Sequence, residues 1–589
     1  MATYEYTIHN HDVLIIGAGG AGLRAAIAAA DKGASVACIS KVPPTRSHTV
    51  AAQGGINAAL GNRVEDNWQW HMYDTIRGAD WLADQDAVAF MCEHAPAAIL
   101  ELDAMGMPFT RDENGQIYQR AYGGQHTDFG KGGPAYRACA VADRTGHSLL
   151  HTLYGQAVRQ KVEFFSEFMA LDLVFDDENI CRGLLAWELA TGELHLFQAH
   201  STVIATGGFG QAYASTTASS ICTGDGGGMV LRAGLPLQDM EFVQFHPTGL
   251  YGTGLLITEG ARGEGAILLN KHGERFMERY APHGMELASR DVIARAMTQE
   301  ILEGRGCGKD GDHLHLSLTH LDKNVIDTKL PSIRDIAKTF ARIDVEKEYI
   351  PVLPTVHYTM GGIPTNVHGE VIHGLYAIGE AACTSVHGAN RLGCNSLLEL
   401  VVFGKSVGTH AALHAKKAQA HKPIQSHQLE PSFSRLEAFS QSRGGSKTAA
   451  IRKELQHAMQ THAGIFRTYD LLEEGQQKLR QLWKKMQEDL LISDTSRIWN
   501  NEMVGALETD NLLRQATVAI ACALERTESR GAHWRQDYPA RDDTEWLTHS
   551  LGAVDDNGNV RHSTTKVRMN YTEPKTQKIK SVPPEDRVY

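Results

Sequence analysis

Residues 17–22, near the start of the chain, have the spacing of a phosphate-binding loop. They read G-A-G-G-A-G, which places three glycines in the G-x-G-x-x-G pattern. Glycines at this spacing let the backbone approach a pyrophosphate, and a helix that starts there offers N–H groups and a positive dipole end. The residues placed to make such contacts are Gly17, Gly19, Gly20, Ala21 and Gly22.

The elements around this loop are of the kind that the pattern needs. Residues 12–16 read D-V-L-I-I, a short apolar run typical of a strand buried in a parallel sheet. An alanine-rich helix is predicted to about Lys32, and a second strand over Ser35–Ser40. Strand, glycine loop, helix and strand together predict a Rossmann-like βαβ unit that binds a dinucleotide.

One part of the usual fingerprint is missing. An acid that binds the ribose is expected about 20 residues after the glycines, but Ser40 and Lys41 stand there. A second candidate for nucleotide contact is the predicted strand 202–208, which runs into two glycines. Since no second complete G-x-G-x-x-G unit occurs, we expect one bound dinucleotide rather than FAD and NAD together.

Composition sets limits on function. With 589 residues, 42% hydrophobic, three or four domains are expected. The net charge of -12 and the lack of a basic stripe argue against nucleic acid as a partner. Nine cysteines with no C-x-x-C pair argue against a disulfide framework and against a zinc or iron–sulfur site, so no metal is predicted.

No membrane span or leader is predicted. No run of 18 or more apolar residues occurs, and Met1–Asp12 has no basic start followed by an apolar core. Either the protein stays where it is made or a leader has been removed, and the retained Met1 favours the first alternative. The cysteine usage fits a reducing compartment best.

The remainder of the chain divides by pattern. Residues 251–354 are mixed and interrupted, and they lie between two segments of nucleotide-binding character, which indicates an inserted domain. Residues 416–447 are polar and indicate a surface connection. A helical domain is predicted beyond them, because apolar residues recur at intervals of three and four. These are Ile451, Leu455, Met459, Leu479, Leu482, Met486 and Leu490.

Residues 47–55, S-H-T-V-A-A-Q-G-G, resemble the histidyl-flavin motif of succinate dehydrogenase and fumarate reductase flavoproteins. The family's other motifs follow in order at 244–249 (Q-F-H-P-T-G), 258–265 (T-E-G-A-R-G-E-G), 289–292 (S-R-D-V), 357–362 (H-Y-T-M-G-G), 387–393 (H-G-A-N-R-L-G) and 530–535 (R-G-A-H-W-R). Two residues depart from the family: Cys394 replaces Gly or Ala, and Ala218 replaces Asn. We interpret Cys394 as filling space rather than tuning the flavin.

The resemblance implies an α/β fold, with a Rossmann-like FAD-binding domain and an inserted α+β capping domain. A helical domain and a small C-terminal domain would follow. The boundaries are 1–250 and 355–430 for the discontinuous FAD-binding domain, 251–354 for the capping domain, 431–547 for the helical domain and 548–589 for the C-terminal tail or domain.

The resemblance also implies that FAD is bound covalently through His48 and the flavin 8α-methyl group. An ordinary loop histidine is the alternative. The attachment would raise the potential of the flavin, which helps because succinate is a weak reductant. Asp225, in a glycine-rich loop, could instead be a turn former. The implied FAD contacts beyond the first glycine loop are Ser40, Lys41, Thr49, Gln53, Gly54, Gly55, Asp225, Glu380, Arg391, Ser396 and Leu397.

For the substrate, the resemblance implies a four-carbon dicarboxylate, with His246, Thr258, His357 and Arg391 holding its two ends. Arginine provides a planar fork for a carboxylate, while histidine and threonine provide lighter contacts. Hydride would pass from one substrate carbon to flavin N5, and a proton from the adjacent carbon to Arg290.

Two further residues, Glu259 and Arg262, would carry that proton to solvent. Arginine is normally protonated, so Arg290 would need strong local help to act as a base. The alternative role for the same three residues is an ion-pair network that holds the inserted domain in place.

Among family members, Gln53 resembles the dehydrogenase pattern, since quinol-linked fumarate reductases tend to carry glutamate there. L-aspartate oxidase shares much of the substrate shell but binds FAD non-covalently and lacks a histidine at the position of His48. A non-catalytic scaffold is disfavoured because none of the expected site residues is missing.

As for partners, the resemblance implies those of respiratory complex II: an iron–sulfur subunit docked on this chain and seated on membrane anchor subunits. A flavinylation factor is plausible. The chain would be peripheral, on the cytoplasmic side of a bacterial inner membrane or the matrix side in mitochondria.

Overall fold

The computed structural model describes residues 5–418 and 420–587. Met1, on which the expectation about a leader depends, lies outside the described residues. Val588 and Tyr589, the last two residues of the sequence, also lie outside them.

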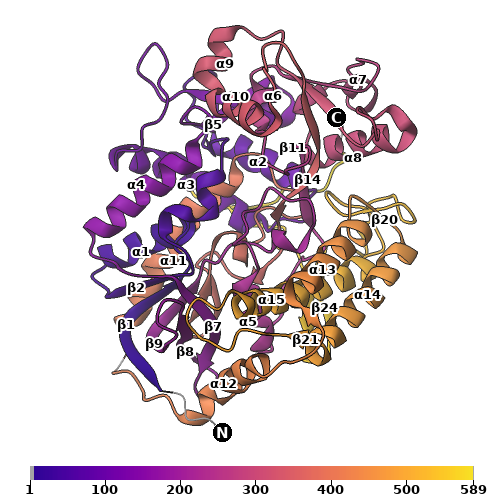
Figure 1. Cartoon of the computed structure of the whole chain (residues 1–589). Coiled ribbons are helices and arrows are strands. Elements are labelled where there is room, and N and C mark those ends of the chain that lie inside the picture. Colours follow the sequence, from indigo (N-terminus) through magenta and orange to yellow (C-terminus); the bar gives the residue numbers. More distant parts are fainter. Residues whose placement is uncertain (1–4, 419, 588–589) are drawn as a thin grey trace.

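An eight-stranded sheet is the base of the nucleotide-binding part (Figure 1). β1 (Tyr6–Ile16) lies between β9 (Leu194–Ile204) and β2 (Val36–Ser40) and is parallel to both, and α1 (Gly20–Asp31) connects β1 to β2. The predicted βαβ unit is confirmed, although β1 starts earlier than expected because its first half pairs with β9. The other strands are β6 (Glu163–Ser166), β7 (Phe168–Phe175), β8 (Cys181–Glu188), β16 (Glu370–Ile372) and β17 (Leu375–Ala377).

A close helix pair covers one face of this sheet. α11 (Asn395–Ala415) packs directly on α1, because the alanines of α1 meet two glycines of α11. A Cβ at Gly408 would lie 2.2 Å from the carbonyl oxygen of Ala25, and one at Gly404 would lie 2.9 Å from Arg24 Cβ. The small residues therefore let the two helices approach, and both begin at the same pocket.

The segment after β11 (Val243–Leu250) forms the upper part of Figure 1. Its sheet has the order β11, β14 (Ile350–Thr359), β13 (Leu314–Ser317) and β12 (Ile267–Leu269). One hydrophobic cluster draws its buried residues only from Leu250 to Val352. The division of the chain into domains stays a prediction, and this separate cluster favours it, although β11 and β14 link the segment to its neighbours.

Three long helices lie at the lower right of Figure 1: α13 (Thr448–His462), α14 (Tyr469–Glu488) and α15 (Asn501–Glu525). They confirm the helical periodicity, except that Leu490 belongs to a two-residue strand, β21 (Leu490–Leu491).

The expected surface connection at 416–447 is wrong for residues 426–440, which form α12 (Ser426–Ser440). Leu429 and Leu436, seven residues apart in a polar sequence, are buried in a cluster with β7 and β8. The apolar stripe is too short to recognise among polar residues, and its burial against strands distant in the sequence decides the helix.

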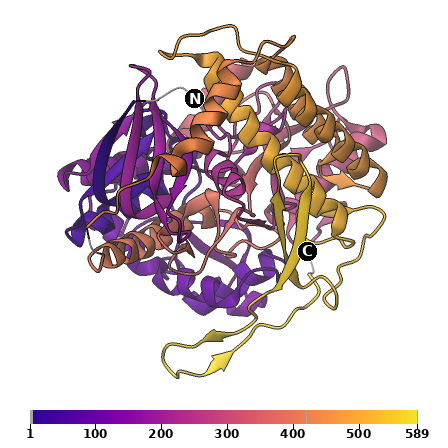
Figure 2. The ribbon, with the colours of Figure 1, turned by 90° about the horizontal axis from the view of Figure 1, so that it is seen from below.

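The polar C-terminal region begins with a hairpin, β23 (Thr548–Val554) and β24 (Val560–Lys566), which pairs with β10 (Leu237–Gln238) and is coloured yellow in Figure 2. Near its end, Arg587 forms ion pairs with Asp80 (3.1 Å) and with Asp291 of α8 (Arg290–Glu300; 3.0 Å). The end of the described chain is thus tied both to the nucleotide-binding part and to the start of α8.

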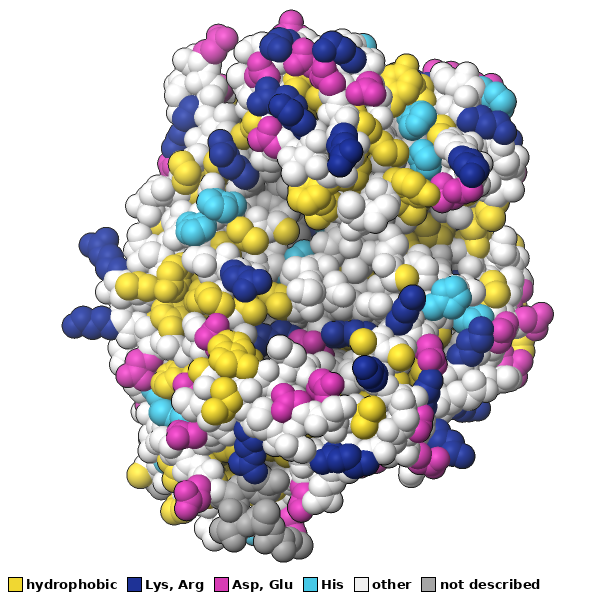
Figure 3. All heavy atoms as spheres, in the orientation of Figure 1, with side chains coloured by type: hydrophobic (Ala, Val, Ile, Leu, Met, Phe, Trp, Pro, Cys, Tyr) yellow, Lys and Arg dark blue, Asp and Glu magenta, His cyan; other side chains and the backbone are white. Residues whose placement is uncertain are grey.

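The face of the molecule shown in Figure 3 mixes acidic and basic side chains, without a stripe of one sign. This mixture and the net charge of -12 favour the expectation that nucleic acid is not a partner. Among the helices of the described ranges, none combines the length and the apolar character needed to cross a bilayer.

Candidate active site

One large pocket lies between the loop after β1, the start of α11 and the strands β11 and β14. Its volume is about 1550 Å³ including the open mouth. It brings together every predicted site residue except Gly22, Glu259 and Arg262, and also Ala205–Gly207 from the predicted strand 202–208. The predicted residues that line it are Gly17, Gly19, Gly20, Ala21, Ser40, Lys41, His48, Thr49, Gln53, Gly54, Gly55, Asp225, His246, Thr258, Arg290, His357, Glu380, Arg391, Ser396 and Leu397.

The nucleotide end of the pocket is built mainly from backbone. Gly17 has φ +111°, a conformation that favours glycine. A Cβ at Gly22 would lie 1.9 Å from the carbonyl oxygen of Gly17, so only glycine at position 22 lets the helix start pack this closely against the turn. The residues that precede α1 and α11, Gly19 and Cys394, form no side-chain hydrogen bond to the helix N–H groups. Two helix starts therefore face one pocket. Their first N–H groups are used, since Gly20 N–H donates to Thr49 Oγ1 at 3.0 Å and Asn395 N–H to the Leu392 carbonyl oxygen at 3.4 Å, and the N–H groups that follow suit the phosphate and carbonyl oxygens of a dinucleotide.

Lys41 has acidic partners that its local sequence does not supply. Its Nζ lies 2.8 Å from Asp225 Oδ2 and 2.7 Å from Glu508 Oε1, and it donates to Thr223 Oγ1 at 2.6 Å. Asp225 starts α5 (Asp225–Arg232), and Glu508 lies in α15. The acidic partners of Lys41 are thus provided by tertiary structure, and Thr223 and Glu508 were not predicted.

His48 lies in a short 3₁₀ helix (His48–Ala51) that follows β2. Its Nδ1 accepts a hydrogen bond from the Ser219 N–H at 3.3 Å. Removal from bulk water lowers the pKa of His48 to about 4. The imidazole is therefore neutral at pH 7, and Nε2 is the nitrogen left for a further bond.

The opposite end of the pocket combines two histidines and two arginines. The rings of His246 and His357, from the paired strands β11 and β14, are 5.0 Å apart and edge to face. Burial, with Arg290 as the next cause, lowers the pKa of both histidines well below its usual range. Because Thr248 N–H donates to His246 Nδ1 at 3.2 Å, the proton of His246 is on Nε2. Arg290 and Arg391 therefore carry the positive charge, and the histidines are neutral.

Arg290, the first residue of α8, belongs to a buried charge network. Its Nε donates to Glu259 Oε2 at 2.8 Å, and Arg262 Nη2 lies 3.9 Å from the same oxygen. Burial alone would raise the pKa of Glu259, but the two guanidinium groups outweigh it and lower the pKa. Glu259 and Arg262 thus lie behind Arg290 rather than in the pocket wall, and Arg262 also donates to the Glu286 carbonyl oxygen.

Gln244 was not predicted, yet it connects the two pocket arginines. Its Oε1 accepts from Arg290 Nη1 at 3.0 Å, and its Nε2 donates to the carbonyl oxygen of Arg391 at 2.7 Å. The feature of the sequence that could have identified Gln244 is its position as the first residue of the Q-F-H-P-T-G motif.

Arg391 retains a free donor. Its guanidinium lies 4.3 Å from the centre of the Tyr358 ring, and its buried Nε has no hydrogen-bond partner among the described residues. Burial, with Arg290 adding to it, lowers the pKa of Arg391 to about 10. A carboxylate bound in the pocket would satisfy this donor.

Gln53 joins the nucleotide loop to the substrate end. Its Nε2 donates to the Leu256 carbonyl oxygen at 2.9 Å, and its Oε1 accepts from Thr258 N–H at 3.0 Å. Thr258 in turn caps α6 (Glu259–Gly263), since its Oγ1 accepts from Gly260 N–H. The glycine loop and the end of the pocket that holds the histidines and arginines are therefore connected through the side chain of Gln53.

Two other residues sit where these ends meet. Tyr122, which was not predicted, lines the pocket with its hydroxyl 3.4 Å from Thr258 Oγ1. Cys394 has φ +67°, a conformation that favours glycine. Burial raises the pKa of the Cys394 thiol to about 12, so it stays protonated. This favours the interpretation that Cys394 fills space, which stays a prediction.

Glu380 accepts from Thr359 N–H at 3.0 Å, and burial raises its pKa to about 7.

Comparison with known proteins agrees with this geometry. Residues 12–397 match the FAD binding domain family, and residues 452–589 match the family described as fumarate reductase flavoprotein C-term. The chain belongs to the succinate dehydrogenase and fumarate reductase flavoprotein family. It is 55% identical to the succinate dehydrogenase flavoprotein subunit of Rickettsia bellii, with all of both chains covered. It is 53% identical to the mitochondrial succinate dehydrogenase [ubiquinone] flavoprotein subunit of Oryza sativa, covering 100% of this chain and 95% of that protein.

Among solved structures, E. coli quinol fumarate reductase superposes with a TM-score of 0.92 at 39% identity, covering 99% of each chain. The predictions of family, fold class and enzyme class are confirmed: this chain is an FAD-binding oxidoreductase. The two helix starts and the glycine turn of the pocket fit that cofactor.

Proposed function

We propose that this chain is the flavoprotein subunit of a succinate dehydrogenase and oxidises succinate to fumarate with FAD held covalently on His48. The observation that carries the proposal is one pocket that combines an uncharged histidine beside a dinucleotide site with two arginines and two neutral histidines. The names of relatives at 53–55% identity favour the same activity.

The cofactor end is held by backbone and by His48. The N–H groups at the start of α1 suit the pyrophosphate, and those of Ser396 and Leu397 at the start of α11 suit the carbonyl oxygens of the flavin. His48 Nε2 is the nitrogen available for attachment, because Nδ1 is engaged by Ser219. FAD bound there supplies the two-electron redox chemistry.

The substrate carboxylates are held at two ends. His246 with Thr258 binds one carboxylate, and His357 with Arg391 binds the other. The unpartnered Nε of Arg391 and the Nε2–H of His246 are donors suited to carboxylate oxygens. Gln244 fixes the spacing between Arg290 and Arg391.

Arg290 exchanges the proton with the substrate carbon, and Glu259 and Arg262 carry it onward. Arg290 and Glu259 are already in contact at 2.8 Å, and the lowered pKa of Glu259 keeps a carboxylate available to accept. Beyond Arg262 the side-chain contacts stop, because Arg262 donates to the backbone carbonyl oxygen of Glu286, whereas the Glu286 carboxylate pairs with Arg275. The run of side chains from Arg290 through Glu259 to Arg262 is what supports a proton path.

Gln53 favours succinate oxidation as the main direction. A glutamate in its place would set a carboxylate against the carbonyl oxygen of Leu256, where Gln53 Nε2 now donates. Fumarate reduction is the second candidate, since quinol fumarate reductase matches the fold closely.

For partners, electrons would pass to an iron–sulfur subunit and on to quinone through membrane anchor subunits. The relative named succinate dehydrogenase [ubiquinone] supports a quinone acceptor. The chain would lie peripherally on the cytoplasmic or matrix side of the membrane, and a flavinylation factor would assist the attachment of FAD.

The deciding experiment is flavin fluorescence of the acid-precipitated protein on a denaturing gel. We expect a fluorescent band near 64.5 kDa that is lost in His48→Ala and kept in His147→Ala, an exposed histidine of α4 (Thr145–Arg159). Succinate oxidation should accompany the band. Flavin that washes away from correctly assembled protein would contradict the covalent link and point to L-aspartate oxidase, with L-aspartate as the substrate to test.

A further inference from the structure

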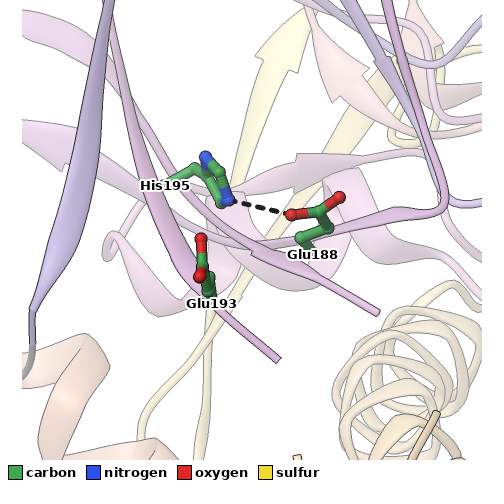
Figure 4. A group of neighbouring side chains, drawn as sticks. All are labelled: Glu188, Glu193 and His195. Carbon is green, nitrogen blue, oxygen red and sulfur yellow. Dashed lines mark ion pairs between the residues drawn. The ribbon is translucent and has the colours of Figure 1, made fainter. Parts of the chain in front are cut away.

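A second cluster of reactive side chains lies outside the pocket, at the tip of the β8–β9 hairpin (Figure 4). Glu188 is the last residue of β8, Glu193 directly precedes β9, and His195 is the second residue of β9. One ligand atom from each residue, two carboxylate oxygens and one imidazole nitrogen, lie within 4.8 Å of one another.

The hairpin itself forces the two carboxylates together. Glu188 N–H donates to the Glu193 carbonyl oxygen at 2.9 Å, so the two residues face each other across the strands. His195 projects on the same side as Glu193, because side chains alternate along a strand. Like charges directly opposite destabilise a sheet. Among the ion pairs between described residues, neither glutamate has a lysine or arginine partner, and Glu188 pairs with His195.

His195 is held as a ligand would be. The residue is 7% exposed, and its ring packs edge-on to Phe168 at 5.0 Å and stacks on His9 at 5.2 Å. Its Nδ1 shares a hydrogen bond of 3.0 Å with His9 Nε2. Its Nε2 is buried without a hydrogen bond and lies 3.3 Å from Glu188 Oε2. One ring nitrogen is oriented by a neighbour and the other is aimed at carboxylates, as in metal-binding histidines.

The distances and donors suit zinc. Ligands of a tetrahedral zinc ion, with bonds of about 2.0–2.2 Å, are separated by roughly 3.4 Å, close to the Nε2–Oε2 distance of 3.3 Å. Glu193 is exposed and can rotate inward, while Thr191 Oγ1 orients Glu188 by donating to Oε2 at 2.7 Å. Magnesium and calcium prefer more numerous ligands that are all oxygen, whereas imidazole favours zinc and its neighbours.

We propose that Glu188, Glu193 and His195 bind one zinc ion, with water completing its coordination. The ion neutralises the facing carboxylates and fastens the hairpin. A zinc ion bound to His195 Nε2 requires the proton of the ring to be on Nδ1. His9 Nε2, in β1, lies 3.0 Å from Nδ1 and is placed to accept a hydrogen bond from it, so β1 supplies an outer partner of the site. This site is structural and takes no part in the reaction proposed for the pocket.

The test is a zinc titration of the untagged full-length flavoprotein, stripped with a chelator and followed in competition with a coloured chelator. The wild type should bind one zinc ion more than Glu193→Gln, or bind it at least about tenfold more tightly. Glu193→Gln is exposed and nearly isosteric, so the fold is kept. His147→Gln, which removes an exposed histidine beside His151, is the matched control and should behave as the wild type. Magnesium should not compete.

Anomalous diffraction at the zinc edge then locates the ion. Density between Glu188, Glu193 and His195 supports the site, and density elsewhere overturns it. Equal zinc number and affinity in the wild type and Glu193→Gln would also overturn it. His195→Gln should lose the same ion, and if that buried substitution prevents folding, the Glu193 variant still decides. Succinate oxidation should be the same in the wild type and Glu193→Gln, which separates this result from the proposed function.

Discussion

Two buried networks of arginine and glutamate lie in this chain, and they differ in how completely their donors are used. In one, Arg526 Nε donates to Glu241 Oε1 at 2.7 Å, and Arg526 and Arg530 both donate to Glu528 Oε1, at 2.9 and 2.7 Å. These four side chains are 0% exposed. We call this network closed because every guanidinium nitrogen in it has a hydrogen-bond acceptor, and it ties the end of α15 to β23.

In the other network, Arg290 contacts Glu259 but also lines the pocket. Arg262 Nε and Nη2 have no hydrogen-bond partner among the described residues, although Nη2 is 3.9 Å from Glu259. Arg391, beside Arg290, keeps an unpartnered Nε. Buried donors left in this state cost stability.

The comparison shows how a structural role and a ligand-binding role can be told apart for a buried network of charged side chains. In a closed network the internal hydrogen bonds offset the desolvation cost of the buried charges, so that removing one partner is strongly destabilising. An open network beside a cavity keeps donors for a ligand, and a bound carboxylate would offset the stability that the unpartnered donors cost. Sequence shows arginine and glutamate in both places, so only the geometry separates them.

The largest expected effect is on catalysis, from Arg290→Lys. Lysine keeps the charge but loses the fork that reaches Glu259 and Gln244, so kcat should fall by roughly 10²–10⁴-fold. Thermal stability and covalent flavin content should stay close to those of the wild type. Steady-state kinetics on succinate, with Tm and flavin content measured in parallel, check this; a variant that keeps most of its turnover removes the proton-transfer role.

The closed network should respond in the opposite way. Glu528→Gln removes the carboxylate that Arg526 and Arg530 share and leaves each with one acidic partner, Glu241 and Asp543, which should cost about 3–5 kcal/mol of stability. The apparent Tm should drop by several degrees, while kcat/KM of the folded fraction changes less than twofold. A large loss of kcat/KM at unchanged Tm would mean that the two networks have been assigned the wrong way round.

A more gradual effect, spread over several pH units, is expected from pH near the closed network. Burial alone would lower the pKa of His549, but Asp239 at 2.6 Å and Asp84 at 3.3 Å outweigh it and raise the pKa to about 10. The stabilisation is complete below the unfolded pKa of about 6.5 and is lost as pH rises toward 10, with a slope of at most about 1.4 kcal/mol per pH unit.

His549→Gln should flatten this dependence between pH 6.5 and 10. The apparent Tm of the wild type and the variant, measured across that range, gives the comparison. Parallel curves for the two proteins would show that His549 is not the titrating group.

Much of the nucleotide end could be predicted because it depends on neighbouring residues. The glycine turn, the start of α1 and the apolar strands are all fixed within about 40 residues, and each has a backbone requirement that few residue types meet. The histidine and arginine positions of the substrate end came from the family resemblance. Their roles stay predictions, although the pocket brings them together.

What the sequence by itself determined was the βαβ unit, the helical periodicity after residue 447 and the set of residues that gather at the pocket. Tertiary structure alone decided the partners: Asp225 and Glu508 on Lys41, Gln244 between two arginines, the burial that makes α12 a helix, and His9 behind His195. The physical reason is the distance along the chain over which each kind of interaction acts. Backbone conformation and apolar periodicity act over a few residues, whereas the pairing and desolvation of polar groups depend on segments that meet only in the folded chain.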